Sequence, residues 1–335
     1  MLTTCFNAAH RQVGAPGSDT VVLVTQPVGA VDRVARGMVS TFGVGLFLGL
    51  APAAAFAGWW LVPGMVLAAV LAVLFVLSTP DTQAGVVAPV VGILGRIATA
   101  AAVAVAFGRY VLPGRPEVGA VVLVLVMAAV VLLATPLPPV VDRVAVLVVV
   151  GVLVVVAVAC FTIAPVDLPA APPADAAGTD EPFGLLPSAV LLYVCFAGIR
   201  VTHSRRDRVV VVGLVLAVSL AVAIGALWQL GGERLALSTA PLRDVLTAAD
   251  ASGIEGLLAV GVTVACVFAL RGVLGDIRDL APAVNLGGHQ VVAVGAGLAA
   301  LCALLLDPVY TLTGAAVLLL GEAVIRMLVS RRNRA

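Results

Sequence analysis

Charged residues are scarce in this sequence of 335 residues, and lysine is missing altogether. Charged side chains make up 11% of the chain, and all 19 basic residues are arginine. A soluble domain has about a quarter of its residues charged, so this chain has too little polar side chain to cover a globule in water. Its net charge of +1 argues against a nucleic-acid partner. Without lysine, no buried ammonium group is available to titrate.

Motifs for catalysis and metal binding are missing as well. The sequence contains no His-Glu-x-x-His, Gly-x-Ser-x-Gly, phosphate-loop or Cys-x-x-Cys pattern. Its three histidines have no carboxylate at a useful spacing, and its five cysteines do not stand at the spacing of metal ligands. We therefore expect no enzyme activity, no catalytic residue, no metal site and no cofactor.

Apolar residues, in contrast, make up 62% of the chain and come in blocks close to 20 residues long. A block of this length crosses a hydrocarbon core about 30 Å thick as a helix. The blocks do not alternate apolar with polar residues, as barrel strands would. We therefore predict an all-α polytopic membrane protein with about ten transmembrane helices. The predicted helices are 38–57, 60–78, 86–108, 117–135, 143–163, 185–202, 208–229, 254–274, 288–305 and 309–329.

The arginines predict the orientation in the membrane, because cytoplasmic segments carry an excess of basic residues. If both chain ends are cytoplasmic, the internal segments hold 14 of the 19 arginines and the external loops hold four. With an odd number of helices, this uneven distribution of arginines between the two sides would be lost. We therefore expect a multi-pass protein of the plasma membrane, with the lipid bilayer around it and both termini in the cytoplasm.

The helices divide into two groups of five. We predict a first five-helix repeat over residues 37–163 and a second over 185–329. An external loop at 164–184, which is acidic and rich in Pro and Ala, separates them. A cytoplasmic tail at 1–36 precedes the repeats, and a basic cytoplasmic tail at 330–335 follows them.

Ionisable side chains inside a bilayer are costly, so each one is a candidate functional residue. Arg96 lies in the third predicted helix, where it either pairs across the bundle or reaches towards the inner surface. Glu322 lies in the last predicted helix with Arg326 four residues later, the favoured order for a helical ion pair. We interpret that pair as a local salt bridge rather than a proton relay. Arg109 is expected to extend to the external interface.

The first predicted helix carries Gly43, Gly45, Gly49 and Pro52 within ten residues. Two interpretations are open. Gly45 and Gly49 have the small-xxx-small spacing of packed membrane helices. Alternatively, the helix is discontinuous, and its freed amides and half-helix dipole hold an anionic group near the midplane. Such breaks come in pairs, and Gly198 in the sixth predicted helix is a candidate partner.

Several short segments resemble the amino acid–polyamine–organocation (APC) permeases, in a short actinobacterial-type form. The resemblance runs in order along most of the chain. The segments are 43–47 (Gly-Val-Gly-Leu-Phe), 51–55 (Ala-Pro-Ala-Ala-Ala), 95–101 (Gly-Arg-Ile-Ala-Thr-Ala-Ala), 196–198 (Phe-Ala-Gly) and 237–244 (Leu-Ser-Thr-Ala-Pro-Leu-Arg-Asp).

This resemblance implies a 5+5 inverted repeat of the LeuT/APC type, with helices 1 and 6 broken. It also implies a permease for amino acids or related amines that works by alternating access, with proton or exchange coupling. The backbone of the first break would bind a substrate carboxylate, and the sixth helix would face the amino group and side chain. The implied substrate-binding residues are Gly43, Val44, Gly45, Leu46, Phe47, Tyr193, Phe196, Ala197 and Gly198.

The sequence departs from this family at its internal segments. Residues 202–208 read Thr-His-Ser-Arg-Arg-Asp-Arg, where the family carries Gly-Glu-Glu and a Pro-Arg stretch. Some relatives use a lysine in the fifth helix for coupling, and this chain has none. The alternative function is therefore a degenerate relative that no longer transports and serves as a membrane scaffold or regulatory partner.

Overall fold

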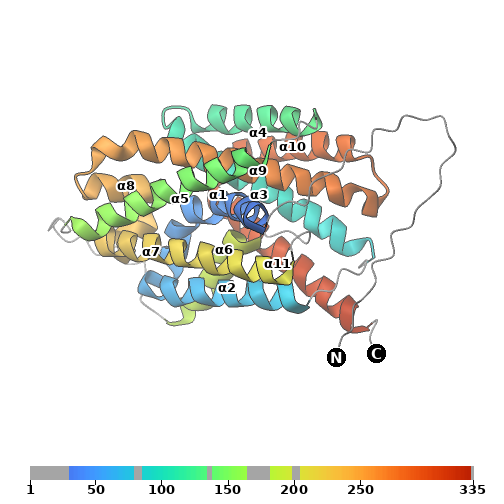
Figure 1. Cartoon of the computed structure of the whole chain (residues 1–335), viewed down its shortest axis with the longest axis horizontal. Coiled ribbons are helices and arrows are strands. Elements are labelled where there is room, and N and C mark those ends of the chain that lie inside the picture. Colours follow the sequence, from blue (N-terminus) through green and yellow to red (C-terminus); the bar gives the residue numbers. More distant parts are fainter. Residues whose placement is uncertain (1–29, 79–84, 134–137, 164–181, 198–203, 333–335) are drawn as a thin grey trace, which may run out of the picture.

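A computed structural model describes residues 30–78, 85–133, 138–163, 182–197 and 204–332, and these ranges fold into eleven α-helices with short 3-10 turns (Figure 1). The helices run roughly along the long axis of the molecule. They are α1 (Ala30–Ala57), α2 (Leu61–Ser78), α3 (Val87–Val111), α4 (Pro116–Leu132), α5 (Pro139–Thr162), α6 (Leu185–Ala197), α7 (Arg205–Leu237), α8 (Pro241–Ala248), α9 (Glu255–Leu280), α10 (Gly288–Leu305) and α11 (Pro308–Arg332).

Each of the ten predicted helices corresponds to one of these helices, and α8 is additional. Helix α1 begins at Ala30, inside the predicted tail, and α11 continues to Arg332. Helix α7 extends beyond its predicted end at residue 229 and has a kink at Gly231, whose φ is 71°. Most of the predicted external loop lies outside the described residues.

Seven helical stretches of the described chain are long and apolar enough to cross a membrane. Helix α4 and residues Leu185–Phe196 of α6 are apolar but shorter. One long stretch, Gly45–Leu77, passes from α1 through a 3-10 turn into α2, and Gly58 in this turn has a φ of 50°. The chain is therefore a multi-pass helical membrane protein, and the number of ten spans stays a prediction.

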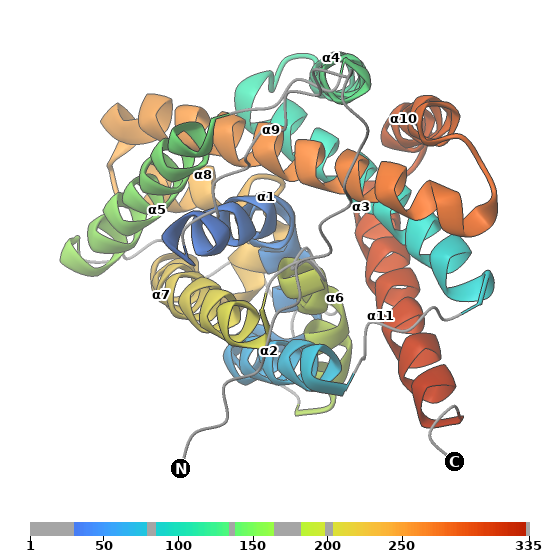
Figure 2. The same cartoon turned by 45° about the vertical axis from the view of Figure 1, so that its right-hand side comes forward.

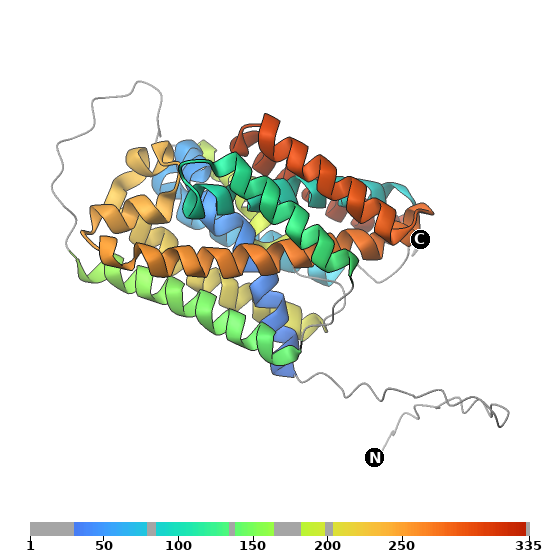
Figure 3. The ribbon, with the colours of Figure 1, turned by 90° about the horizontal axis from the view of Figure 1, so that it is seen from above.

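Helix α1 lies at the centre of the bundle and packs against α5, α6, α7 and α9 (Figure 2). Helix α3 packs against α4, α9, α10 and α11, while α2 packs against α6 and α7. Helices α4 and α10 lie side by side on one flank (Figure 3). Small side chains allow these close packings, as in α3, where residues 100–106 are alanine or valine and all are buried.

The break predicted in the first helix is absent, because α1 runs as one helix from Ala30 to Ala57. A Cβ atom on Gly45 would overlap the Cys195 Sγ of α6 and come within 2.8 Å of the Cys195 Cα. The glycine therefore serves the close packing of α1 on α6. Helix α6 ends at Ala197, and the second predicted break, at Gly198, lies outside the described residues.

Candidate functional site

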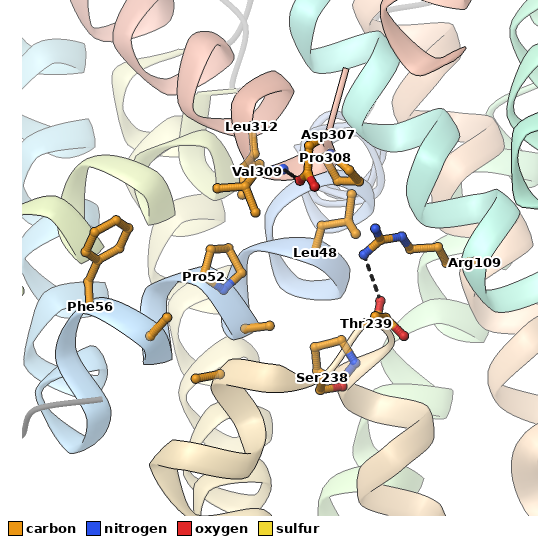
Figure 4. Close-up of a pocket in the computed structure, with 14 residues that line it drawn as sticks. Leu48, Pro52, Phe56, Arg109, Ser238, Thr239, Asp307, Pro308, Val309 and Leu312 are labelled. Atoms are coloured by element: carbon orange, nitrogen blue, oxygen red, sulfur yellow. Dashed lines mark hydrogen bonds between the residues drawn. The ribbon is translucent and has the colours of Figure 1, made fainter. Parts of the chain in front are cut away.

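A pocket of about 320 Å³ opens at the end of the bundle where α8 lies (Figure 4). The second half of α1 forms one wall, and the other walls come from the end of α3, the α7–α8 connection and the start of α11. Most lining side chains are apolar. The polar ones are Arg109, Ser238, Thr239 and Asp307.

Two side chains of opposite charge line this pocket from different helices. Arg109 comes from the last turn of α3, and its Nη1 donates a hydrogen bond to the Thr239 carbonyl oxygen at 3.2 Å. Asp307 directly precedes α11, and its Oδ1 accepts a hydrogen bond from the Val309 amide at 2.9 Å. This contact caps the helix. Within the described residues no ion pair joins Arg109 to Asp307, although both point into the pocket in Figure 4.

The α1 wall of the pocket contains the proline of the helix. Pro52 has no amide hydrogen, so the carbonyl oxygen of Leu48, four residues earlier, has no helical donor. Leu48 and Pro52 both line the pocket. Below them, the Tyr110 hydroxyl donates to the Phe47 carbonyl oxygen at 3.3 Å and accepts from the Leu242 amide at 3.1 Å. One side chain thus connects α1, α3 and α8 beneath the pocket.

The opposite end of α1 is held by two ion pairs. Arg33 contacts Asp207 in the first turn of α7 at 2.8 Å, and Arg36 contacts Asp142 in the first turn of α5 at 2.9 Å. The two aspartates are largely buried, whereas the two arginines are about half-exposed. These contacts close the bundle around the start of α1.

A larger charged cluster joins α3, α9 and α11 on the same side of the bundle as these pairs. Arg96 contacts Glu322 at 2.6 Å and Asp276 at 3.4 Å, and Arg326 contacts Glu322 at 2.7 Å. The Glu322 side chain is only 8% exposed. It lies against Gly92, where an added Cβ would come within 2.5 Å of the carboxyl carbon.

This cluster confirms the predicted local pair of Glu322 with Arg326. Arg96 was expected either to pair across the bundle or to reach towards the inner surface, and its contacts with Glu322 and Asp276 show that it pairs across the bundle. Sequence reasoning missed Asp276, because only the tertiary packing of α9 on α3 brings this carboxylate to Arg96. It also missed the role of Gly92, one helical turn before Arg96.

The predicted substrate residues lie where α1 packs on α6. Leu46, Phe47 and Phe196 are each 1% exposed, and Tyr193 is buried with its ring edge-on to Phe75. Gly45 packs on Cys195, and none of these residues lines the described pocket. Gly43, Val44 and Ala197 lie within α1 and α6, while Gly198 lies outside the described residues.

The pocket lining on α1 begins at Leu48, directly after Phe47, the last predicted residue on this helix. Sequence reasoning identified Arg109 and expected it to extend to the interface, which stays a prediction, and its guanidinium bonds to the Thr239 carbonyl at the pocket. Asp307 was missed. The signal for it is Asp-Pro at the start of a helix, which is typical of a capping residue followed by proline in the first turn.

Comparison with known proteins adds similarity to transporters. No family model matches the chain. Proteins of Mycobacterium bovis and Mycobacterium tuberculosis that carry the name uncharacterized transporter are 29% identical over 280 residues, covering 74% of this chain. The chain spans 63% of the length of these relatives.

Proposed function

We propose that this protein is a plasma-membrane permease that moves amino acids or related amines by alternating access. The observation that carries this proposal is the contrast between the two ends of α1. A pocket opens beside its second half, while ion pairs hold its first half against α5 and α7. A transporter closed on one side and open on the other has this arrangement. The similarity to proteins named as transporters supports the same function.

The packing of the helices supports an inverted repeat. If the two halves are related, α1 corresponds to α6, α2 to α7, α3 to α9, α4 to α10 and α5 to α11. Five packed pairs then have a packed counterpart in the other half. The contacts of α1 with α7 and with α5 correspond to those of α6 with α2 and with α11. The contacts of α3 with α11, with α4 and with α10 correspond to those of α9 with α5, with α10 and with α4. The contact of α1 with α9 has no comparable counterpart among the described residues. A bundle of two related halves can rock around a central site.

The arginines, together with the exposed aromatic residues, support an orientation with the pocket outside. The exposed aromatic residues gather where α1, α5 and α7 end and where α6 and α11 begin, which is the pocket end of the bundle. Aromatic rings favour both membrane interfaces and so mark this end as one of them, whereas arginines favour the cytoplasmic side and indicate which end faces it. Arginines instead concentrate at the starts of α5 and α7 and the end of α11. The exposed aromatic residues are Phe56, Trp59, Trp60, Phe161, Phe183, Trp228 and Tyr310.

We infer a substrate route from the pocket along α1 towards the predicted site. Leu48 lines the pocket, and its neighbour Phe47 is one of the predicted substrate residues. Separating α1 from α6 would bring Phe47 and Phe196 to the substrate. Coupling to protons or to exchange stays a prediction.

The continuous α1 favours the second candidate, a relative that has lost transport and acts as a scaffold or regulatory partner. A broken first helix would expose backbone groups to a substrate, and α1 has none exposed in that way around Gly45. The pocket beside α1 favours the permease, because a scaffold has no need of one.

Binding followed by transport tests the permease. The purified chain is screened by thermal unfolding against amino acids and polyamines, and compounds that shift the transition are tested for uptake into proteoliposomes. A ligand present at 100 times its Kd stabilises the folded state by about 2.7 kcal/mol. Liposomes without protein are the control. A well-folded sample with neither a shift nor uptake across the panel would favour the scaffold.

A further inference from the structure

We propose that the pocket between Arg109 and Asp307 recognises an α-amino acid as a zwitterion with a short apolar side chain. Arg109 would bind its carboxylate and Asp307 its ammonium group. This assignment rests on the proposed transport function and adds a substrate class and two recognition residues to it.

Arg109 is held in a position to bind a carboxylate. One nitrogen of its guanidinium donates to the Thr239 carbonyl, which fixes the side chain at the pocket wall. Its other donors have no hydrogen-bond partner among the described residues. A guanidinium presents its donors as a planar fork, which matches the two oxygens of a carboxylate. Ser238 and Thr239 also line the pocket, and the Ser238 hydroxyl donates a hydrogen bond to Asp244.

Asp307 is held in a position to bind an ammonium group. Its Oδ1 is used by the Val309 amide at the start of α11, and this contact fixes the carboxylate. Its Oδ2 has no hydrogen-bond partner in the described part of the chain. An ammonium group has three donors to distribute. Leu48, whose carbonyl Pro52 leaves without a helical donor, lines the same pocket.

The volume of the pocket and its apolar walls limit the side chain that the ligand can have. The pocket volume of about 320 Å³ lies at the lower end of the range of about 300–1,000 Å³ for small-molecule sites. The remaining walls are apolar and include Ala51, Ala55, Val309 and Leu312. A polyamine would place a second ammonium group against these apolar walls, where no carboxylate is available to it. A short aliphatic amino acid fits the two charges and the walls together.

The test compares valine with two analogues that each lack one charge. Binding of radiolabelled valine to the purified chain in nanodiscs is competed with unlabelled valine, with isobutylamine, which lacks the carboxylate, and with isovalerate, which lacks the amino group. We expect valine to bind about 10- to 100-fold more tightly than either analogue, because a hydrogen-bonded charged pair contributes that much.

Two variants assign each charge to its partner. Arg109→Gln should weaken valine about 10- to 100-fold and leave isobutylamine unchanged. Asp307→Asn should weaken valine by a similar factor and leave isovalerate unchanged, while asparagine still caps α11. The matched controls are Arg115→Gln and Asp250→Asn, which make the same charge changes outside the pocket lining and should leave all three ligands unaffected.

The outcomes separate this inference from the proposed function. If wild-type chain binds and transports valine but the pocket variants behave like their controls, the pocket assignment is wrong and the permease stands. If the folded chain binds polyamines but not valine, the substrate class is wrong. If it neither binds nor transports any amino acid or amine, both proposals fail.

Discussion

Two arginines of α3 illustrate the difference between the two ends of the molecule. Arg96 and Arg109 are 13 residues apart, which corresponds to about 20 Å along a helix. Arg96 has the carboxylates of Asp276 and Glu322 as partners, on two other helices. Arg109 bonds a single backbone carbonyl and faces a pocket that also contains Asp307.

The comparison shows how the same residue type supports two roles. An arginine that is enclosed with its carboxylates connects helices, and removing one partner leaves a charge that is buried without compensation. An arginine beside an open pocket, with donors to spare, is available to a ligand. The charged cluster therefore holds α3, α9 and α11 together, and the pocket at the other end of α3 is the proposed place for a ligand.

The largest effect is expected when the charged cluster of α3, α9 and α11 loses its central carboxylate, Glu322. Glu322→Gln removes the buried carboxylate that the partly buried Arg96 and Arg326 share, so the free energy of unfolding should fall by about 3–5 kcal/mol. Thermal or denaturant unfolding of the purified chain measures it. Asp279→Asn is the control, because its pair with Arg278 is mostly exposed and should contribute about 1 kcal/mol at most. Equal effects for both variants would contradict the assigned role of the cluster.

A second test asks whether Gly45 serves packing. Gly45→Ala places a methyl group on Cys195 and should destabilise the fold by about 1–3 kcal/mol through overpacking. Gly49→Ala is the matched control on the same helix, since its Cβ would meet Leu192 at an ordinary 3.6 Å. The same unfolding assay compares the two. An unchanged stability for Gly45→Ala would show that α1 and α6 are not packed this closely.

The two ion pairs of α1 should give a smaller and more local effect. Each involves a half-exposed arginine, so we expect about 0.5–1 kcal/mol per pair. In the double variant Arg33→Gln/Arg36→Gln, amide hydrogen exchange in the first turns of α1 should accelerate about 5- to 30-fold. The double variant Arg331→Gln/Arg332→Gln, at the end of α11, is the control. Exchange that accelerates equally in both variants would argue against a specific closure around α1.

The smallest effect is expected beneath the pocket. Tyr110→Phe removes the hydroxyl that joins Phe47 to Leu242, which should lower the free energy of unfolding by about 1 kcal/mol. Tyr310→Phe, at an exposed tyrosine, should have no measurable effect. If the two variants unfold alike, the hydroxyl does not hold α1, α3 and α8 together.

The sequence by itself determined the helical membrane class and the approximate position of each long helix. Apolar blocks near 20 residues and turn residues between them are local signals, so they can be read along the chain. The pair of Glu322 with Arg326 was predictable for the same reason, because helical geometry alone brings side chains four residues apart together.

Only the tertiary structure decided which distant residues meet. The same glycine-rich segment is compatible with a broken helix or with close packing, and the position of Cys195 against Gly45 decides for packing. Asp276 is 180 residues from Arg96, and Asp307 lines the same pocket as Arg109 only because α11 begins where α3 ends. Such contacts depend on how helices are arranged in space, and no local pattern in the sequence carries that information.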